Sequence, residues 1–563
     1  MRALLLLLAR AGMICLLVPT CVFCQESARG IDWREDLDYL VERLEVTHPN
    51  LYANVSRESF LECVARLKKK IPAASDVEMF FGVQELLARI QNAHTLCNPS
   101  IFNLNANEGL KAQFHYYPIV YYSFDDGLYV VATAEQHQAI LGRKVVRIGN
   151  LASDEAMREL SRFVAGDNDM TILGNLTRFY INDGQLLRHI GASESPDGIL
   201  LTLENDDGGL FDYEIVTDSN YGTAAIRWLS MVNSSANPTP LYRKNRGVHY
   251  WFEYLPEERA VYLQINLMYN VESDSFPAFC DRLFDTLDAN SAKKLIVDVR
   301  GCPGGDHIEL PLLKGILARP HIDQADRLFL IIGRMTGSAS QHLTTELERY
   351  TNATLFGEAT ASKPNQYGNM ERFSLPHSKL EIACARRYFQ DAGPSDYSMA
   401  SMPDIYVARS SEDFRQNRDP VMERIFGYDS YRHLKPAFKE LMSKAYMDGG
   451  LDGFKKTYDS IKTTYVKHGF NMENLLFKDL DAWMGSNSKS EEDYVEYLEF
   501  IHRELPNSIA VCYDLAYWMY ERGNEEEAKR LYKRCLELNP EHHSAKWRLG
   551  LIGMEERWPR PNR

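Results

Sequence analysis

Features that would indicate several other protein classes are missing from this sequence of 563 residues. It has no basic run that could neutralise phosphates, and its formal net charge is −15, so nucleic-acid binding is not expected. After residue 24, no segment is long and apolar enough to span a membrane. The cysteines beyond residue 24 are scattered, without a CxxC pair or a metal-ligand spacing. We expect small buried thiols, with one disulfide left open, and neither a metal site nor a cofactor.

The first 24 residues have the pattern of a secretory signal peptide. Arg2 precedes an apolar stretch that is too short for a comfortable permanent anchor. Cleavage before Gln25 would release an exported protein, periplasmic or extracellular. A lipid anchor on Cys21 or Cys24 is the alternative.

The residue pattern changes several times along the chain, whose length allows for about three to four domains. After the signal peptide (residues 1–24), we expect a helical domain at 25–110, a β-rich module at 111–220, a polar linker at 221–248, a core of alternating strands and helices at 249–428, and a helical region at 429–563. This order predicts a multidomain α+β protein.

Local signals support the first two of these regions. Asp32 is expected to cap a helix whose apolar residues share one face, and further helices are expected from Ser59 and from Asp76. In the β-rich module, the turn residues at 125–127 separate two aromatic and β-branched runs, which is typical of paired strands.

Residues 329–363 place a serine and a lysine around two predicted strands. An apolar run at 329–332 is short enough for a buried strand, and Ser338 then opens a segment with helical spacing. The free N–H groups of a first helical turn point to where an oxyanion would form. A second apolar run at 353–356 leads to Lys363, where a general base could sit. The pattern also fits a serine helix cap and a surface lysine.

A glycine-rich loop follows another predicted strand, at residues 295–299. It runs from Arg300 to the adjacent pair Gly304 and Gly305. Paired glycines let the backbone approach a ligand closely and leave its N–H groups unobstructed. A tight strand-to-helix turn is the simpler interpretation, and both can hold together.

These stretches resemble the active-site region of the C-terminal processing peptidases, also called tail-specific proteases. Residues 338–341, Ser-Ala-Ser-Gln, are similar to the family's Ser-Ala-Ser-Glu, and residues 357–363 to its Gly-Glu-Pro-Thr-x-Gly-Lys. The glycine-rich loop resembles the family's Asp-Leu-Arg-x-Asn-Pro-Gly-Gly. The resemblance covers about residues 31–425. It implies a crotonase-like α/β catalytic core, an N-terminal helical domain and a PDZ-like module that would capture an extended peptide.

The resemblance also implies roles for individual residues. It makes Ser338 the nucleophile and Lys363 the general base of a Ser–Lys dyad. The oxyanion would be held by the Ala339 N–H and by Gly304 or Gly305. Such acyl transfer needs no metal or cofactor.

Three positions depart from the family pattern. Cys302 replaces a usual asparagine, Gln341 a glutamate and Ala359 a proline. None of these changes removes a member of the dyad. Together they indicate a divergent branch, or one that has lost catalysis.

His94 offers a different base. It lies in an Ala-His-Thr element similar to one in the tricorn-type branch of the family, where the corresponding histidine is the base toward the serine. In this hypothesis Asp396 or Glu358 would orient the ring. A structural histidine at a helix end is the other interpretation.

The helical C-terminal region contains one segment that fits a tetratricopeptide repeat. Residues 509–542 carry the signature positions of a 34-residue unit, and a second unit starts at His543. One full repeat cannot bury its own faces, so it must pack on the helices of 431–505. We expect a docking surface for a protein partner, or a structural cap.

These observations predict an exported serine endopeptidase that cleaves proteins or peptides near free C-termini. The rival hypothesis is an inert or latent peptide-binding protein on the same fold. A third is a hydrolase of non-peptide acyl groups, because the crotonase-like core also serves acyl-thioester chemistry. Retention of both Ser338 and Lys363 favours the enzyme.

Overall fold

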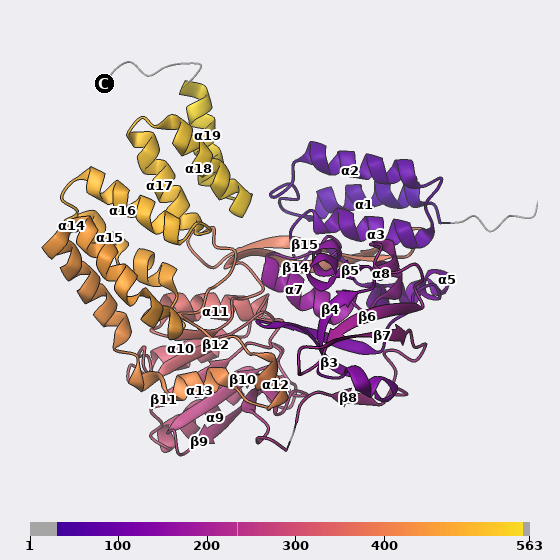
Figure 1. Cartoon of the computed structure of the whole chain (residues 1–563), viewed down its shortest axis with the longest axis horizontal. Helices are drawn as coiled ribbons and strands as arrows, with labels where there is room; N and C mark the ends of the chain where they lie inside the picture. Colours follow the sequence, from indigo (N-terminus) through magenta and orange to yellow (C-terminus); the bar gives the residue numbers. More distant parts are fainter. Residues whose placement is uncertain (1–30, 234, 556–563) are drawn as a thin grey trace, which may run out of the picture.

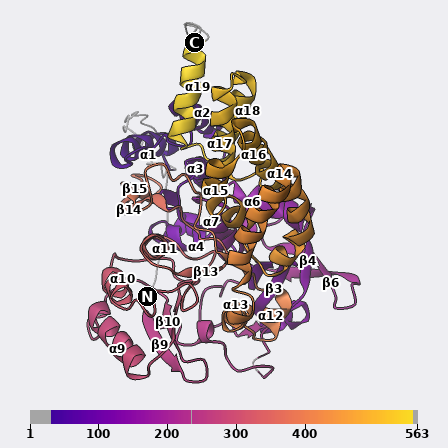
Figure 2. The ribbon, with the colours of Figure 1, turned by 90° about the vertical axis from the view of Figure 1, so that its left-hand side faces the viewer.

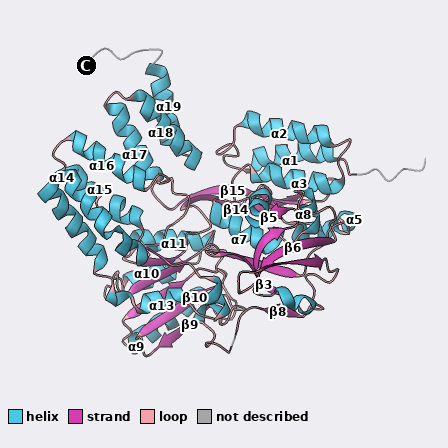
Figure 3. Ribbon diagram, viewed as in Figure 1, coloured by secondary structure: helices cyan, strands magenta, loops and turns pink. Residues whose placement is uncertain are grey.

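The computed structural model describes residues 31–233 and 235–555. The expected signal peptide, with Cys21 and Cys24, lies outside these residues. Two larger sheets form the lower part of the view in Figure 3, and the N-terminal and C-terminal helices lie above them. Within the described ranges, no helix is long and apolar enough to cross a membrane.

The N-terminal part is a set of amphipathic helices, as the sequence predicts. Its main helices are α1 (Trp33–Thr47), α2 (Arg57–Lys70) and α3 (Asp76–Ala88). Asp32 caps α1 as expected, whereas α2 starts before Ser59 because the Ser56 hydroxyl accepts the Ser59 N–H. Two short helices follow, α4 (Ser100–Asn103) and α5 (Glu108–Lys111).

The second part is built on an antiparallel sheet with the order β2-β3-β4-β6-β7. Its strands are β2 (Ile119–Phe124), β3 (Gly127–Ala134), β4 (Lys144–Ile148), β6 (Gly198–Glu204) and β7 (Leu210–Val216). β5 (Leu151–Ala152) pairs with β4, and β8 (Trp228–Ser230) pairs with β3. Helices α6 (Ser153–Ser161), α7 (Asp169–Asn175) and α8 (Gly184–His189) lie between β5 and β6 in the sequence. The predicted linker at 221–248 therefore contributes a strand to this sheet.

The third part is a sheet with the order β16-β13-β12-β11-β10-β9. It lies at the lower left of Figure 1, where β9 to β12 are labelled. Its strands are β9 (Tyr250–Leu255), β10 (Ala260–Ile265), β11 (Lys294–Asp298), β12 (Leu328–Ile332), β13 (Thr354–Gly357) and β16 (Ile405–Tyr406). All pairs are parallel except β9 with β10. The helices α9 (Phe276–Ala289), α10 (Leu310–Leu317), α11 (Ala339–Tyr350), α12 (Ser411–Arg415) and α13 (Pro420–Phe426) belong to the same part.

Both faces of this sheet are buried, which explains why its strands are apolar runs and not alternating ones. Alternate residues point to opposite faces. Leu295 and Val297 pack in one core with α9, α10 and α11. Ile296 and Phe329 face the other way, into a core that continues into α13 and the C-terminal helices.

A small three-stranded sheet connects the N-terminal helices to the third part. Its order is β1-β15-β14, with β1 (Leu96–Cys97), β14 (Asn365–Ser374) and β15 (Glu381–Gln390). β1 follows His94 closely in the sequence, and β14 follows Lys363. The sheet therefore brings these two predicted residues toward the same region.

The C-terminal helices run along one side of the molecule, from α14 up to α19 (Figure 2). They are α14 (Leu434–Lys467), α15 (Asp481–Asn487), α16 (Glu491–Glu504), α17 (Ile509–Glu521), α18 (Glu525–Leu538) and α19 (His543–Glu555). The predicted repeat at 509–542 corresponds to the helix pair α17 and α18, and its core is continuous with that of the preceding helices.

The cysteines of the described ranges behave as small apolar side chains. All are buried and free, namely Cys63, Cys97, Cys280, Cys302, Cys384, Cys512 and Cys535. This confirms the expectation of buried thiols.

Candidate active site

Ser338 occupies a strained turn between β12 and α11. It is the residue before the first helical residue, with φ 52° and ψ −124°. A side chain other than glycine rarely adopts such a backbone, and the conformation costs about 1–3 kcal/mol. Ser338 is half-buried, and within the described ranges no hydrogen bond engages its hydroxyl. The turn therefore presents an uncommitted hydroxyl at the start of a helix.

The loop with Gly304 and Gly305 lies directly against this turn. A Cβ atom added to Gly304 would be 2.6 Å from the Ser338 Cβ and 2.8 Å from the Ala339 nitrogen. Gly304 has φ +110° and Gly305 has φ +145°, so both adopt backbone conformations that favour glycine. Gly305 pairs with Met268 in a β-bridge. The Ala339 N–H begins α11 and has no partner within the helix by its position. Gly304 is thus the glycine that closely contacts Ser338.

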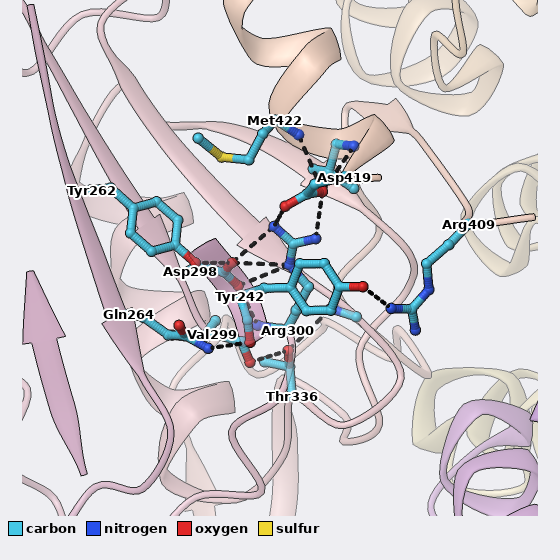
Figure 4. A network of polar contacts seen from close by, with 12 residues as sticks. Tyr242, Tyr262, Gln264, Asp298, Val299, Arg300, Thr336, Arg409, Asp419 and Met422 are labelled. Carbon is cyan, nitrogen blue, oxygen red and sulfur yellow. Dashed lines mark hydrogen bonds and ion pairs between the residues drawn. The ribbon is translucent and has the colours of Figure 1, made fainter. Parts of the chain in front are cut away.

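A buried charge network holds the base of this loop (Figure 4). The Arg300 guanidinium donates to Asp298 Oδ2 at 2.9 Å, and its two terminal nitrogens donate to Asp419 at 2.8 and 3.0 Å. The Tyr262 hydroxyl donates to Asp298 Oδ2 at 2.6 Å. Paired carboxylates and a bidentate arginine satisfy one another's charge where both carboxylates are buried. The network fixes the direction in which the loop leaves β11.

Side-chain hydroxyls then join the two loops to each other. Thr336 donates to the Val299 carbonyl at 2.9 Å and accepts the Gly333 N–H at 3.0 Å. Ser340 donates to the Cys302 carbonyl at 2.7 Å. The glycine-rich loop and the Ser338 turn are therefore one connected unit.

The segment with Lys363 also contacts the serine turn. Ser362 Oγ accepts the Ser338 N–H at 3.2 Å. Lys363 itself is buried, and its ammonium is paired with Glu541 Oε1 at 2.9 Å. The same oxygen accepts from the Asn54 amide at 2.9 Å. Glu541 belongs to the turn between α18 and α19, so the C-terminal helices reach the predicted catalytic lysine. No sequence signal indicated this contact.

His94 and Ser338 lie toward the same face of β14. Gln366 Nε2 donates to the Ser338 carbonyl at 3.3 Å. Two residues further along the strand, a Cβ atom added to Gly368 would point to His94 Cδ2 at 3.9 Å. Residues two apart in a strand share a face. His94 and Ser338 therefore lie near neighbouring positions on one face of β14.

The environment of His94 favours a neutral imidazole. Burial lowers its pKa below the ordinary value, and His342 acts in the same direction while the Asp167 charge opposes it. Asp167 is held by the Ala93 N–H at 2.9 Å and by Asn92. The His94 Nδ1 is buried and makes no hydrogen bond with the described residues.

The carboxylate near His94 is not one of the two that the sequence suggested. Glu358 pairs with Arg334, and Asp396 accepts the Ser398 N–H. Asp167 is instead the carboxylate whose charge acts on His94. It lies outside every motif of the sequence, so only the fold could identify it.

The three residues that depart from the family pattern are all buried. Burial raises the pKa of the Cys302 thiol to about 11, so Cys302 is a neutral packing residue. Gln341 is buried and donates to Ser401 Oγ at 2.9 Å. Ala359 is buried as well. None of these side chains disrupts the connection between the two loops.

A histidine and carboxylate cluster lies further along α11. His342, one turn after Ser338, is paired with Asp391, and its ring lies 4.2 Å from that of His307. Burial and the charges of nearby carboxylates raise the pKa of Glu346 to about 7. Sequence analysis missed this cluster because its members come from separate segments. No His, Cys, Asp and Glu grouping within 31–233 and 235–555 has the arrangement of a metal site.

The comparisons with known proteins give distant structural likenesses. No family model matches the chain, and no curated protein matches it. Mature CPAF is similar with a TM-score of 0.49 and 10% identity, over 71% of this chain and 97% of that chain. The photosystem II D1 C-terminal processing protease has a TM-score of 0.34 and 14% identity, over 68% of this chain and 94% of that chain. The tricorn protease has a TM-score of 0.29 and 11% identity, over 70% of this chain and 36% of that chain.

Likenesses of this strength carry no functional conclusion, which has to come from the residues of the site. They do include a C-terminal processing protease and the tricorn protease.

Proposed function

We propose that this chain is a serine-type peptidase with Ser338 as its nucleophile. The observation that carries the proposal is the strained Ser338 backbone at the start of α11, with Gly304 packed against it. Strain of this kind persists only where the surroundings enforce it, and it gathers at active sites. A serine that merely capped a helix would not need a positive φ, because caps adopt extended backbone angles.

The proposed cycle is acyl transfer through two tetrahedral intermediates. A base removes the Ser338 proton as the oxygen attacks the scissile carbonyl. The negative oxygen is then held by the Ala339 N–H and by the Gly304 N–H, or that of Gly305 beside it. The protonated base gives its proton to the leaving amine, and an acyl-enzyme forms. Water, deprotonated by the same base, attacks the ester and releases the new C-terminus.

Lys363 is the base that we propose first. Its segment touches the Ser338 backbone through Ser362, and its side chain is buried. A lysine must be neutral to accept the serine proton, and a dry pocket favours the neutral form. In this structure the Lys363 nitrogen is paired with Glu541.

His94 is the second candidate. It is supported by its place on the Ser338 side of β14 and by a pKa that burial lowers, which leaves a neutral imidazole at pH 7. In this version the charge of Asp167 would stabilise the protonated ring.

The proposed substrates are proteins or peptides cut near a free C-terminus. The antiparallel sheet of β2 to β7 would act as the PDZ-like module and add an extended peptide to an edge. We also propose export, in agreement with the leader pattern, and a partner on the C-terminal helices.

The test is covalent labelling of the full chain with a fluorophosphonate probe, from about pH 6 to about pH 10. The variants are Ser338→Ala, Lys363→Met and His94→Gln, with Lys456→Met as the matched control on an exposed helix position. Loss of labelling in Ser338→Ala and Lys363→Met alone would establish the dyad. Loss in Ser338→Ala and His94→Gln alone would establish the histidine mechanism.

The binding-protein alternative predicts a different outcome. A folded wild-type chain that the probe does not label at any pH, and that still binds peptides with free C-termini, would contradict the peptidase proposal. Hydrolysis of thioesters without cleavage of peptides would favour the third hypothesis, a hydrolase of other acyl groups.

A further inference from the structure

We infer that the C-terminal helices are an inhibitory element of this chain, and that Glu541 holds Lys363 in a form unable to act as base. The inference rests on the proposed dyad. It concerns a contact between residues that lie 178 positions apart in the sequence.

The contact is a buried ion pair and not a surface one. Lys363 Nζ and Glu541 Oε1 are 2.9 Å apart, and the two side chains are only 7% and 13% exposed. The Asn54 amide donates to the same oxygen at 2.9 Å. One carboxylate from the C-terminal helices thus fills a position between the N-terminal helices and the catalytic segment.

The turn that carries Glu541 is anchored independently of the ion pair. Asn539 accepts the Glu541 N–H at 2.9 Å and donates to the Tyr397 carbonyl at 2.7 Å. The His542 ring stacks on Tyr397 with their centroids 3.9 Å apart. These contacts fix the turn, so the carboxylate is delivered to Lys363 by the fold.

A second attachment lies on the N-terminal side of the site. Lys546 Nζ donates to the Ala53 carbonyl at 3.2 Å, next to Asn54. The start of α19 is therefore fastened both to the segment after β15 and to the loop after α1. A carboxylate presented by such a docked turn cannot leave Lys363 by side-chain rotation alone without losing the Asn54 bond.

The inhibition follows from what a general base needs before it can act. A general base must be without its proton before it can act. A carboxylate beside an ammonium favours the charged ammonium, and breaking such a buried pair is costly. With Glu541 in place, the Lys363 nitrogen is engaged by a carboxylate and not by the Ser338 hydroxyl, so Ser338 is not activated. Movement of the α18–α19 turn would free the amine.

The experiment compares Glu541→Gln with wild type in the full chain. Glutamine keeps the shape and an oxygen for Asn54, but it removes the charge. The control is Glu537→Gln, in the last turn of α18, where the carboxylate is exposed and pairs with Arg534. Unchanged thermal stability of Glu541→Gln would show that the turn remains docked through Asn539 and His542.

Two readouts keep the inference apart from the proposed function. The first is the rate of fluorophosphonate labelling at Ser338. The second is acylation of Lys363 by an amine-reactive ester, located by mass spectrometry, which does not depend on Ser338. We expect both rates to rise by about tenfold or more in Glu541→Gln, because base catalysis contributes on the order of a hundredfold or more. Both should stay at the wild-type level in Glu537→Gln.

The other outcomes are decisive too. Wild-type rates for both readouts in Glu541→Gln, with labelled Ser338, would overturn the inference and leave the peptidase proposal standing. Slower labelling would also overturn it, since Glu541 would then orient the base. Faster acylation of Lys363 without any labelling of Ser338 would support the restraint on Lys363 and contradict the peptidase proposal.

Discussion

Gly304→Ala should abolish acylation of Ser338, whereas Gly301→Ala in the same loop should leave it intact. The added methyl group of Gly304→Ala would lie 2.6 Å from the Ser338 Cβ, 2.7 Å from the Gly337 carbonyl oxygen and 2.8 Å from the Ala339 nitrogen. All three distances are too short for contacts with Cβ. The same group on Gly301 would meet no atom within 4 Å.

The size of the effect can be worked from these contacts. Overpacking of this kind costs about 1–3 kcal/mol, and an alanine at φ +110° costs about another 1–3 kcal/mol. The atoms in the way are mostly backbone, so relief comes only by moving the loop away from Ser338. Loss of one oxyanion donor lowers the rate by about a hundredfold to a thousandfold. We therefore expect Gly304→Ala to lower the rate of Ser338 acylation by at least about two orders of magnitude.

The assay is the second-order rate constant of fluorophosphonate labelling, with thermal unfolding measured on the same samples. Gly301→Ala controls for the lost flexibility of the loop. Wild-type labelling of a folded Gly304→Ala chain would refute the reasoning, because the loop could then not be the close neighbour of the oxyanion.

The remaining predictions concern stability. Ser338→Gly should melt higher than Ser338→Ala, since glycine relieves about 1–3 kcal/mol of backbone strain against an entropy cost of about 0.5–1 kcal/mol; equal melting temperatures would contradict the strain. Asp419→Asn should lower the free energy of unfolding by about 3 kcal/mol in urea titrations, because it weakens the buried pair with Arg300. The control Asp429→Asn, at an exposed position, should have little effect. Burial lowers the pKa of His48 to about 4, whereas a histidine in the unfolded chain has a pKa of about 6.5. Between these two pH values the unfolded state binds more protons than the folded state. The free energy of unfolding therefore falls as the pH drops from about 6.5 to about 4. His48→Gln should remove about 3 kcal/mol of this loss, and an unchanged pH profile would argue against the buried ring.

Much of the part that carries Ser338 could be predicted from local sequence. The strands around Ser338 are apolar runs because both faces of the sheet are covered, and the loop after β11 carries two glycines with positive φ, Gly304 and Gly305. Such signals act within a few residues, so the elements of this part agree with those expected from the pattern.

The surroundings of the site could not be predicted in the same way. Asp167 and Glu541 belong to no motif, and they act on His94 and Lys363 only because separate parts of the chain pack together. Charge contacts between distant segments leave no periodicity in the sequence. The roles of Ser338, Lys363 and His94 stay predictions, and the variants above test them.

The shared core of the sheet and the C-terminal helices limits how this protein can change over evolution. Ile296 and Phe329 of the sheet belong to one core with Phe438 of α14, and Tyr406 at the sheet edge donates its N–H to the Gly469 carbonyl at 2.7 Å. A gene fusion or deletion near residue 430 would remove the helices that cover one face of the sheet and the backbone that bonds its β16 edge. The helices therefore cannot be exchanged as an independent module, and substitutions in them must be compensated in the strands that they cover.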